Sequence, residues 1–138
     1  MVEVNGTLPP LPVSCGVSQG SILGPLLFLI YANDMSSACD CNLFLFVDDS
    51  ALLVSDKNKL QVEKTLSSEL GRICIWLADN KLSLHMGKTE SILFSSNNKL
   101  SKTDGFSVTV GDNIVTRKDE ITYLGSILEA NLSCDKMA

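Results

Sequence analysis

Two adjacent carboxylates, Asp48 and Asp49, are the residues of this chain whose types and spacing point most directly to chemistry. They follow the apolar residues 43–47. Consecutive side chains of a strand point to opposite faces, so both carboxylates reach one site only if they lie at a turn. Carboxylate oxygens are the ligands that Mg²⁺ prefers, and a pair of Mg²⁺ ions can activate a hydroxyl and neutralise a leaving pyrophosphate. As an isolated dipeptide, however, Asp-Asp is more often a solvated hairpin turn.

A glycine-rich segment, residues 16–21, is the second candidate. Its glycines permit close approach of the backbone to a ligand and offer free amides at the start of a helix. Ser21 is placed to cap a helix that runs to about Ser36, with Pro25 in its first turn. Taken alone, a glycine-rich turn is weak evidence of binding, because most such segments are only turns.

Hydrophobic periodicity predicts the elements that position these residues. Residues 42–54 read as two short strands joined by a tight acidic turn. Residues 59–80 place apolar side chains three or four apart, which predicts an amphipathic helix. The other predictions are an extended segment at 1–15, a strand at 91–94, a polar loop at 97–105, a hairpin of strands 106–110 and 114–116, and a strand at 121–128. This mixed order predicts an α+β fold, with helices packed on one face of an antiparallel sheet.

Composition limits the class of protein. The chain has 138 residues, of which 45% are hydrophobic and 20% charged, so it can form one domain with a core. Its formal net charge is −5, and the scattered Lys and Arg residues form no basic stripe for binding nucleic acid alone. The N-terminus lacks the pattern of a signal peptide. The apolar run 22–32 is shorter than the roughly 20 residues that cross a bilayer, so we expect no membrane contact.

The cysteines do not suggest a metal site. They are five in number, at irregular spacing, and accompany the single histidine His85. We expect reduced, mostly buried thiols in an intracellular protein, with nucleus and cytoplasm both left open. The cysteines are Cys15, Cys39, Cys41, Cys74 and Cys134.

Four short motifs follow one another along the chain. They are residues 16–25, Phe46-Val47-Asp48-Asp49, residues 80–84 with Lys88-Thr89, and Tyr123-Leu124-Gly125. Taken in order, they resemble the palm domain of reverse transcriptases: its Gln-Gly-Ser loop, its aromatic-x-Asp-Asp hairpin, its Asn…Lys-Thr segment and its primer-grip strand. The residues of these motifs are most similar to those of non-LTR retrotransposons. The resemblance covers residues 1–132, a partial palm of the right-hand polymerase type, and leaves 133–138 as a tail.

The resemblance implies a role for each matching residue. Asp48 and Asp49 would hold the metal ions, with Asp48 the more direct ligand. Lys88 would protonate the departing pyrophosphate, although an ordinary surface lysine explains it equally well. The residues implied to contact template, primer or nucleotide are Gln19, Gly20, Ser21, Phe46, Tyr123 and Gly125.

The sequence departs from the family pattern in three places. Ser18 stands where the family usually has Pro, and Val47 where it often has Ala. The family's first metal-binding Asp lies on a strand well before the Gln-Gly loop, whereas no Asp precedes Gly16 here. The resemblance thus implies a parent RNA-directed DNA polymerase that uses two Mg²⁺ ions, an RNA template, a DNA primer and dNTPs. We expect the chain alone to be inactive, to bind Mg²⁺ weakly or not at all, and not to bind nucleic acid tightly.

Two other interpretations stay open at this point. The chain could be an inactive relic of a decayed retroelement that acts, if at all, through protein contacts. It could also be an unrelated α+β binding domain with a fortuitous Asp-Asp turn, which would then have to explain four motifs in order. A palm cut before its first catalytic strand would expose a strand edge, so we also expect poor solubility in isolation.

Overall fold

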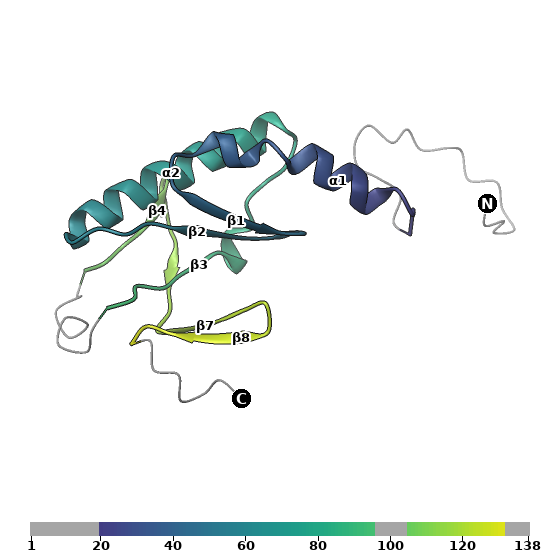
Figure 1. Cartoon of the computed structure of the whole chain (residues 1–138). Coiled ribbons are helices and arrows are strands. Elements are labelled where there is room, and N and C mark those ends of the chain that lie inside the picture. The colour runs from purple at the N-terminus through teal and green to yellow at the C-terminus, as the bar shows by residue number, and fades with distance from the viewer. Residues whose placement is uncertain (1–19, 96–104, 132–138) are drawn as a thin grey trace, which may run out of the picture. The chain divides into compact units, whose positions relative to one another are not determined.

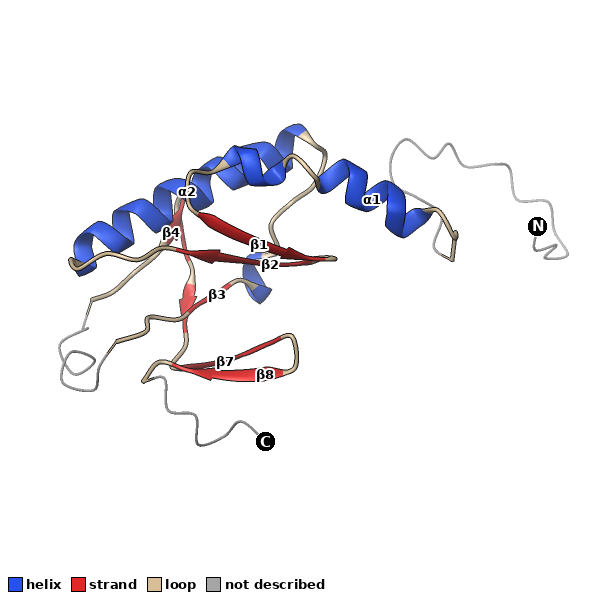
Figure 2. Cartoon of the chain, in the orientation of Figure 1, coloured by secondary structure: helices blue, strands red, loops and turns tan. Residues whose placement is uncertain are grey.

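The computed structural model describes residues 20–95 and 105–131, and the chain divides into two units, Met1–Ala32 and Asn33–Ala138. Figure 1 shows the order of the elements and Figure 2 their types. The predicted extended segment at 1–15, Gln19 and nearly all of the polar loop at 97–105 lie outside the described residues. No helix in the described ranges is long and apolar enough to cross a bilayer.

Helix α1 belongs to the first unit and spans Gly24–Ala32. It begins three residues after the predicted cap, and Ser21 contributes its backbone carbonyl, which accepts the amide of Gly24 at 3.2 Å. Pro25 is the second helical residue, where it fits because the first amides of a helix have no partner within the helix.

The prediction that this helix continues to Ser36 is wrong. The chain turns at Asn33 and Asp34, and a separate 3-10 helix, η1, spans Met35–Ala38. Asn and Asp carry short polar side chains that compete for backbone hydrogen bonds, so they favour the end of a helix over its interior. The apolar periodicity of residues 22–32 gave no sign of this stop.

The predicted acidic hairpin is confirmed. Strand β1 spans Asn42–Phe46 and strand β2 spans Asp49–Leu53, and they pair antiparallel. Phe46 lies opposite Asp49, so the connection is a loop of two residues, Val47 and Asp48. Apolar residues in β1 and at the end of β2 suit a pleated, half-buried pair of strands.

Helix α2 spans Lys59–Asp79, which confirms the predicted amphipathic helix. The side chain of Asn58 caps it by accepting the amide of Leu60 at 3.0 Å. Its apolar stripe packs into two core clusters. The first consists of Met35, Cys39, Ile73 and Leu77, and the second of Val62, Phe106, Val108 and Val115.

The remaining strands are short. They are β3 Glu90–Ser91, β4 Thr109–Val110, β5 Asn113–Ile114, β6 Thr116–Arg117, β7 Glu120–Tyr123 and β8 Ser126–Glu129. The hairpin predicted around residues 106–116 is confirmed as β4–β5, with Gly111 and Asp112 as its loop. The strand predicted at 91–94 is wrong beyond Ser91. The single strand predicted at 121–128 is also wrong, since the chain reverses at Leu124 and Gly125 to form the β7–β8 hairpin.

The α+β class is confirmed, but the single antiparallel sheet is not. The strands of the described residues form four separate two-stranded ladders, β1–β2, β3–β6, β4–β5 and β7–β8. Three are antiparallel, and β3–β6 is parallel because β6 returns beside β3 in the same direction. A two-stranded ladder is marginal alone, so these ladders depend on packing against α2 and on one another. Ser95 and Asp119, for example, both bond to the backbone of Ala130 after β8.

Candidate functional site

The turn of the β1–β2 hairpin presents the two carboxylates. Asp48 is the second loop residue and Asp49 the first residue of β2, so the turn lets adjacent side chains lie at one end of the hairpin. Both residues are exposed. Their carboxylates make no hydrogen bond or ion pair with any residue in the described ranges. Oxygen ligands directed to solvent are free to bind a cation.

Val47 holds this turn in an unusual conformation. Its φ is +55°, whereas Asp48 keeps a negative φ, which is the pattern of a type II′ turn. Glycine normally fills the first position of such a turn, and a β-branched residue there is a genuine outlier. Strain of this kind costs of order 1–3 kcal/mol and clusters at functional sites. The conformation therefore marks the hairpin tip as a candidate site independently of its two carboxylates.

The donor set suits Mg²⁺ in kind but not in number. Carboxylate oxygens are the correct ligands, and Mg²⁺ retains several waters when only one or two carboxylates bind it. No third carboxylate joins Asp48 and Asp49 in residues 20–95 and 105–131. The two carboxylates therefore suit Mg²⁺ only as part of a larger set of ligands.

Phe46 flanks the carboxylates. It lies directly across the ladder from Asp49 and is 57% exposed, although an aromatic ring of this size is normally covered. The structure thus brings Phe46, Asp48 and Asp49 together in one turn, as predicted from the sequence.

Lys88 and the segment before it lie after α2. Asn80 caps the helix, Lys81 adopts a positive φ of +57°, and the amides of Lys81 and Leu82 donate to Ala78 and Leu77. This pair of bonds is a Schellman motif, so the Asn-Lys-Leu sequence has a structural role at the end of α2. Lys88 ends the short 3-10 helix η2, Met86–Lys88, with an exposed side chain. No ion pair joins it to Asp48 or Asp49 in the described part of the chain.

Tyr123 and Gly125 lie at the turn of the β7–β8 hairpin. Leu124 and Gly125 form its two-residue loop with φ values of +49° and +79°, the signature of a type I′ turn. A Cβ added at Gly125 would meet no atom within 4 Å, so lack of space does not explain the glycine. Its positive φ does, because glycine adopts this angle at no steric cost. Tyr123 is half-buried at the end of β7. Among the described residues, this hairpin and the acidic one form separate two-stranded ladders.

The glycine segment is described only from Gly20 onward. Gly20 has a φ of +81°, and Ser21 is exposed beside it. Both residues belong to the first unit, whereas the acidic hairpin belongs to the second. Gln19 lies outside the described residues.

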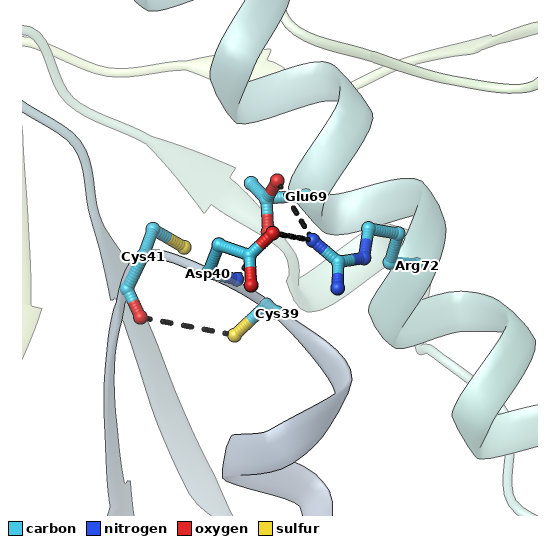
Figure 3. A network of polar contacts seen from close by, with 5 residues as sticks. All are labelled: Cys39, Asp40, Cys41, Glu69 and Arg72. Atoms are coloured by element: carbon cyan, nitrogen blue, oxygen red, sulfur yellow. Dashed lines mark hydrogen bonds and ion pairs between the residues drawn. The ribbon is translucent and has the colours of Figure 1, made fainter.

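Sequence reasoning missed one group of potential ligands, formed by Cys39, Cys41 and Glu69 (Figure 3). The amide of Asp40 donates to Glu69 at 2.7 Å, and Arg72 bonds to both Asp40 and Glu69. Burial, reinforced by the neighbouring Cys39 and Glu69, raises the pKa of the Cys41 thiol to about 11. The Cys-x-Cys spacing was the only available signal, because Glu69 arrives through the packing of α2.

Known proteins resemble this chain over most of its length. A family model described as "Reverse transcriptase (RNA-dependent DNA polymerase)" matches residues 1–128. The RNA-directed DNA polymerase from mobile element jockey of Drosophila melanogaster is 25% identical over 130 residues, and its Drosophila funebris counterpart is 26% identical over 129. The probable RNA-directed DNA polymerase from transposon X-element of Drosophila melanogaster is 25% identical over 130.

These alignments cover 88–90% of this chain but only 14% of each relative. No solved structure gives a significant match.

Proposed function

The chain belongs to the reverse transcriptase family, and from this premise we propose that it presents Asp48 and Asp49 to the catalytic metal ions of an RNA-directed DNA polymerase. The observation that carries the proposal is the strained two-residue turn that places both carboxylates at one exposed end of a hairpin. The relatives named above are described as RNA-directed DNA polymerases of a mobile element and a transposon, which supports the origin in a non-LTR retrotransposon that we propose from the residues of the motifs.

The carboxylates would bind and orient the metal ions, while nearby groups position the substrates. Bound Mg²⁺ would supply Lewis-acid activation of the attacking hydroxyl and neutralise charge on the leaving group. Phe46, exposed beside Asp49, offers a ring face against which the primer end could pack. We further propose that Tyr123 and Gly125 position the primer, that Gln19, Gly20 and Ser21 contact the template and nucleotide, and that Lys88 protonates pyrophosphate.

The chain spans about 14% of the length of the curated relatives that it matches. Activity, template, primer and dNTPs are thus proposed for a polypeptide that supplies the missing parts. We propose that a carboxylate from outside the described residues completes the metal site, since Asp48 and Asp49 have no third acidic partner in the described ranges.

Paramagnetic broadening by Mn²⁺ tests the metal site directly. Mn²⁺ accepts the same oxygen ligands as Mg²⁺ and broadens the NMR signals of nearby nuclei. In the 138-residue chain we expect substoichiometric Mn²⁺ to broaden the amides of Phe46, Val47, Asp48 and Asp49 first. Excess Mg²⁺ should restore these signals, and Asp48→Asn with Asp49→Asn should abolish the broadening.

The β4–β5 hairpin provides a matched control, because Asp112 lies alone in a two-residue loop of the same length. Its amides should broaden only at much higher Mn²⁺, and Asp112→Asn should leave the broadening at Asp48 unchanged. Equal broadening of both hairpins would show that the paired carboxylates bind no better than any exposed Asp, which would contradict the proposal.

A further inference from the structure

A second group of potential metal ligands lies at the base of the acidic hairpin, away from its tip. The Sγ atoms of Cys39 and Cys41 and a carboxylate oxygen of Glu69 all lie within 4.8 Å of one another. We propose that these three side chains form a Zn²⁺ site, with water in the fourth position. The proposal is independent of polymerase activity, because it concerns different residues and a different metal.

The donor chemistry selects the metal. Two thiolates exclude Mg²⁺, which takes oxygen ligands, whereas Zn²⁺ is bound by both cysteine sulfur and carboxylate oxygen. With Zn–S near 2.3 Å, a tetrahedral site places its ligand atoms about 3.8 Å apart. The widest separation in the present cluster is at most 4.8 Å, so side-chain rotations that move atoms by about 1 Å would close it on the metal.

The surrounding residues hold the carboxylate in place. Glu69 is only 8% exposed, and its Oε2 accepts the amide of Asp40 at 2.7 Å and Nη1 of Arg72 at 3.2 Å (Figure 3). Outer hydrogen bonds of this kind orient the ligands of natural metal sites. The amide that donates to Glu69 belongs to Asp40, the residue between the two cysteines. This hydrogen bond therefore also holds both thiols beside the carboxylate.

Charge balance also favours a cation. Two thiolates and Glu69 would place three negative charges in a partly buried position, and the single positive charge of Arg72 is shared with the exposed Asp40. A divalent ion would offset two of these negative charges. Without metal, Cys39 packs as an apolar group against Met35, Ile73 and Leu77.

The bound ion would join two elements. Cys39 and Cys41 precede β1, and Glu69 lies in the middle of α2. Zinc would therefore link the start of the acidic hairpin to α2, and its binding free energy would stabilise the folded chain.

Cobalt substitution tests the site in the full 138-residue chain, reduced and freed of metal. Co²⁺ bound by thiolates gives a charge-transfer band in the near ultraviolet, and Zn²⁺ should displace it at one ion per chain. The triple variant Cys15→Ser/Cys74→Ser/Cys134→Ser retains only the two proposed thiols, and we expect its band to be unchanged. In that background, Cys39→Ser or Cys41→Ser should abolish the band.

Glu69→Gln tests the third ligand. Its amide oxygen can still accept the Asp40 amide, so the fold is retained while Co²⁺ affinity falls by roughly 10-fold or more. Absence of the band in the triple variant, its persistence after Cys39→Ser, or unchanged affinity of Glu69→Gln in a chain of unaltered circular dichroism would each overturn the proposal. The metal-free triple variant can also be exposed to air and weighed by mass spectrometry. A mass lower by two hydrogens, in a variant that gives no cobalt band, would show that Cys39 and Cys41 form a disulfide and do not bind metal.

Discussion

The positive φ of Val47 sets the direction of the two carboxylates that follow it. A turn of this type reverses the chain in two residues and keeps Asp48 and Asp49 at the tip rather than on opposite faces of a strand. A β-branched residue is costly there, so the native state maintains the geometry against local preference.

Val47→Gly should therefore stabilise the chain. Glycine adopts a φ of +55° without steric cost, so we expect the free energy of unfolding to rise by about 1 kcal/mol. Urea titration of dilute protein measures the change as a shift in midpoint at constant slope. Val54→Gly, which removes a side chain packed on the second core cluster, is the control and should destabilise the chain. Equal destabilisation by both substitutions would show that Val47 is unstrained.

Elements with a strong local signal could be predicted from the sequence, and elements that depend on distant contacts could not. Helix α2 and the acidic hairpin have clear periodicity and turn residues, and both were predicted nearly to the residue. The β7–β8 reversal was not predicted because the apolar Leu124 occupies a loop position with positive φ, where Asn or Gly is usual. Strand β3 ends early because its partner β6 is only two residues long.

The candidate site residues show the same contrast between local signals and distant contacts. Phe46, Asp48 and Asp49 are adjacent in sequence, so a turn brings them together. The cluster of Cys39, Cys41 and Glu69 depends on a contact between Asp40 and Glu69, which are 29 residues apart and meet through the packing of α2. A local sequence pattern cannot predict that Glu69 belongs to it.

Val108→Ala tests how far α2 depends on the short strands. Val108 is 1% exposed and belongs to the second core cluster beside Val62 of α2. Removing its two methyl groups should cost about 2 kcal/mol of unfolding free energy, because part of the cavity persists. Ile114→Ala, at a residue that is 70% exposed, should change stability by less than about 0.5 kcal/mol. A similar cost for both, measured by urea titration, would show that the cluster is not a packed core.

At the scale of the whole molecule, large apolar side chains are exposed in both units, among the residues that the structure describes. Helix α1 is apolar on all sides, as is typical of helices covered by other parts of a protein. The exposed large apolar residues of this helix are Leu26, Leu27, Leu29, Ile30 and Tyr31, and those of the acidic hairpin include Phe44, Leu45 and Phe46. This surface supports the expectation of poor solubility in isolation, which stays a prediction.

A primer-extension assay tests the expectation that the chain alone is inactive. With Mg²⁺, dNTPs and an RNA template annealed to a DNA primer, the 138-residue chain should give no product, because Asp48 and Asp49 lack a third carboxylate in the described residues. A complete reverse transcriptase under the same conditions is the positive control. DNA synthesis by the chain that disappears on Asp48→Asn would show that these residues form a complete active site.

Trp76 is the single tryptophan of the chain, and it packs half-buried against the first core cluster, which also contacts Leu43 of β1 and Leu52 of β2. Its indole emission thus reports on one place, the junction of helix and acidic hairpin. Changes in wavelength or intensity on unfolding, or on loading a metal at the neighbouring thiols, can be assigned to that junction without an added label.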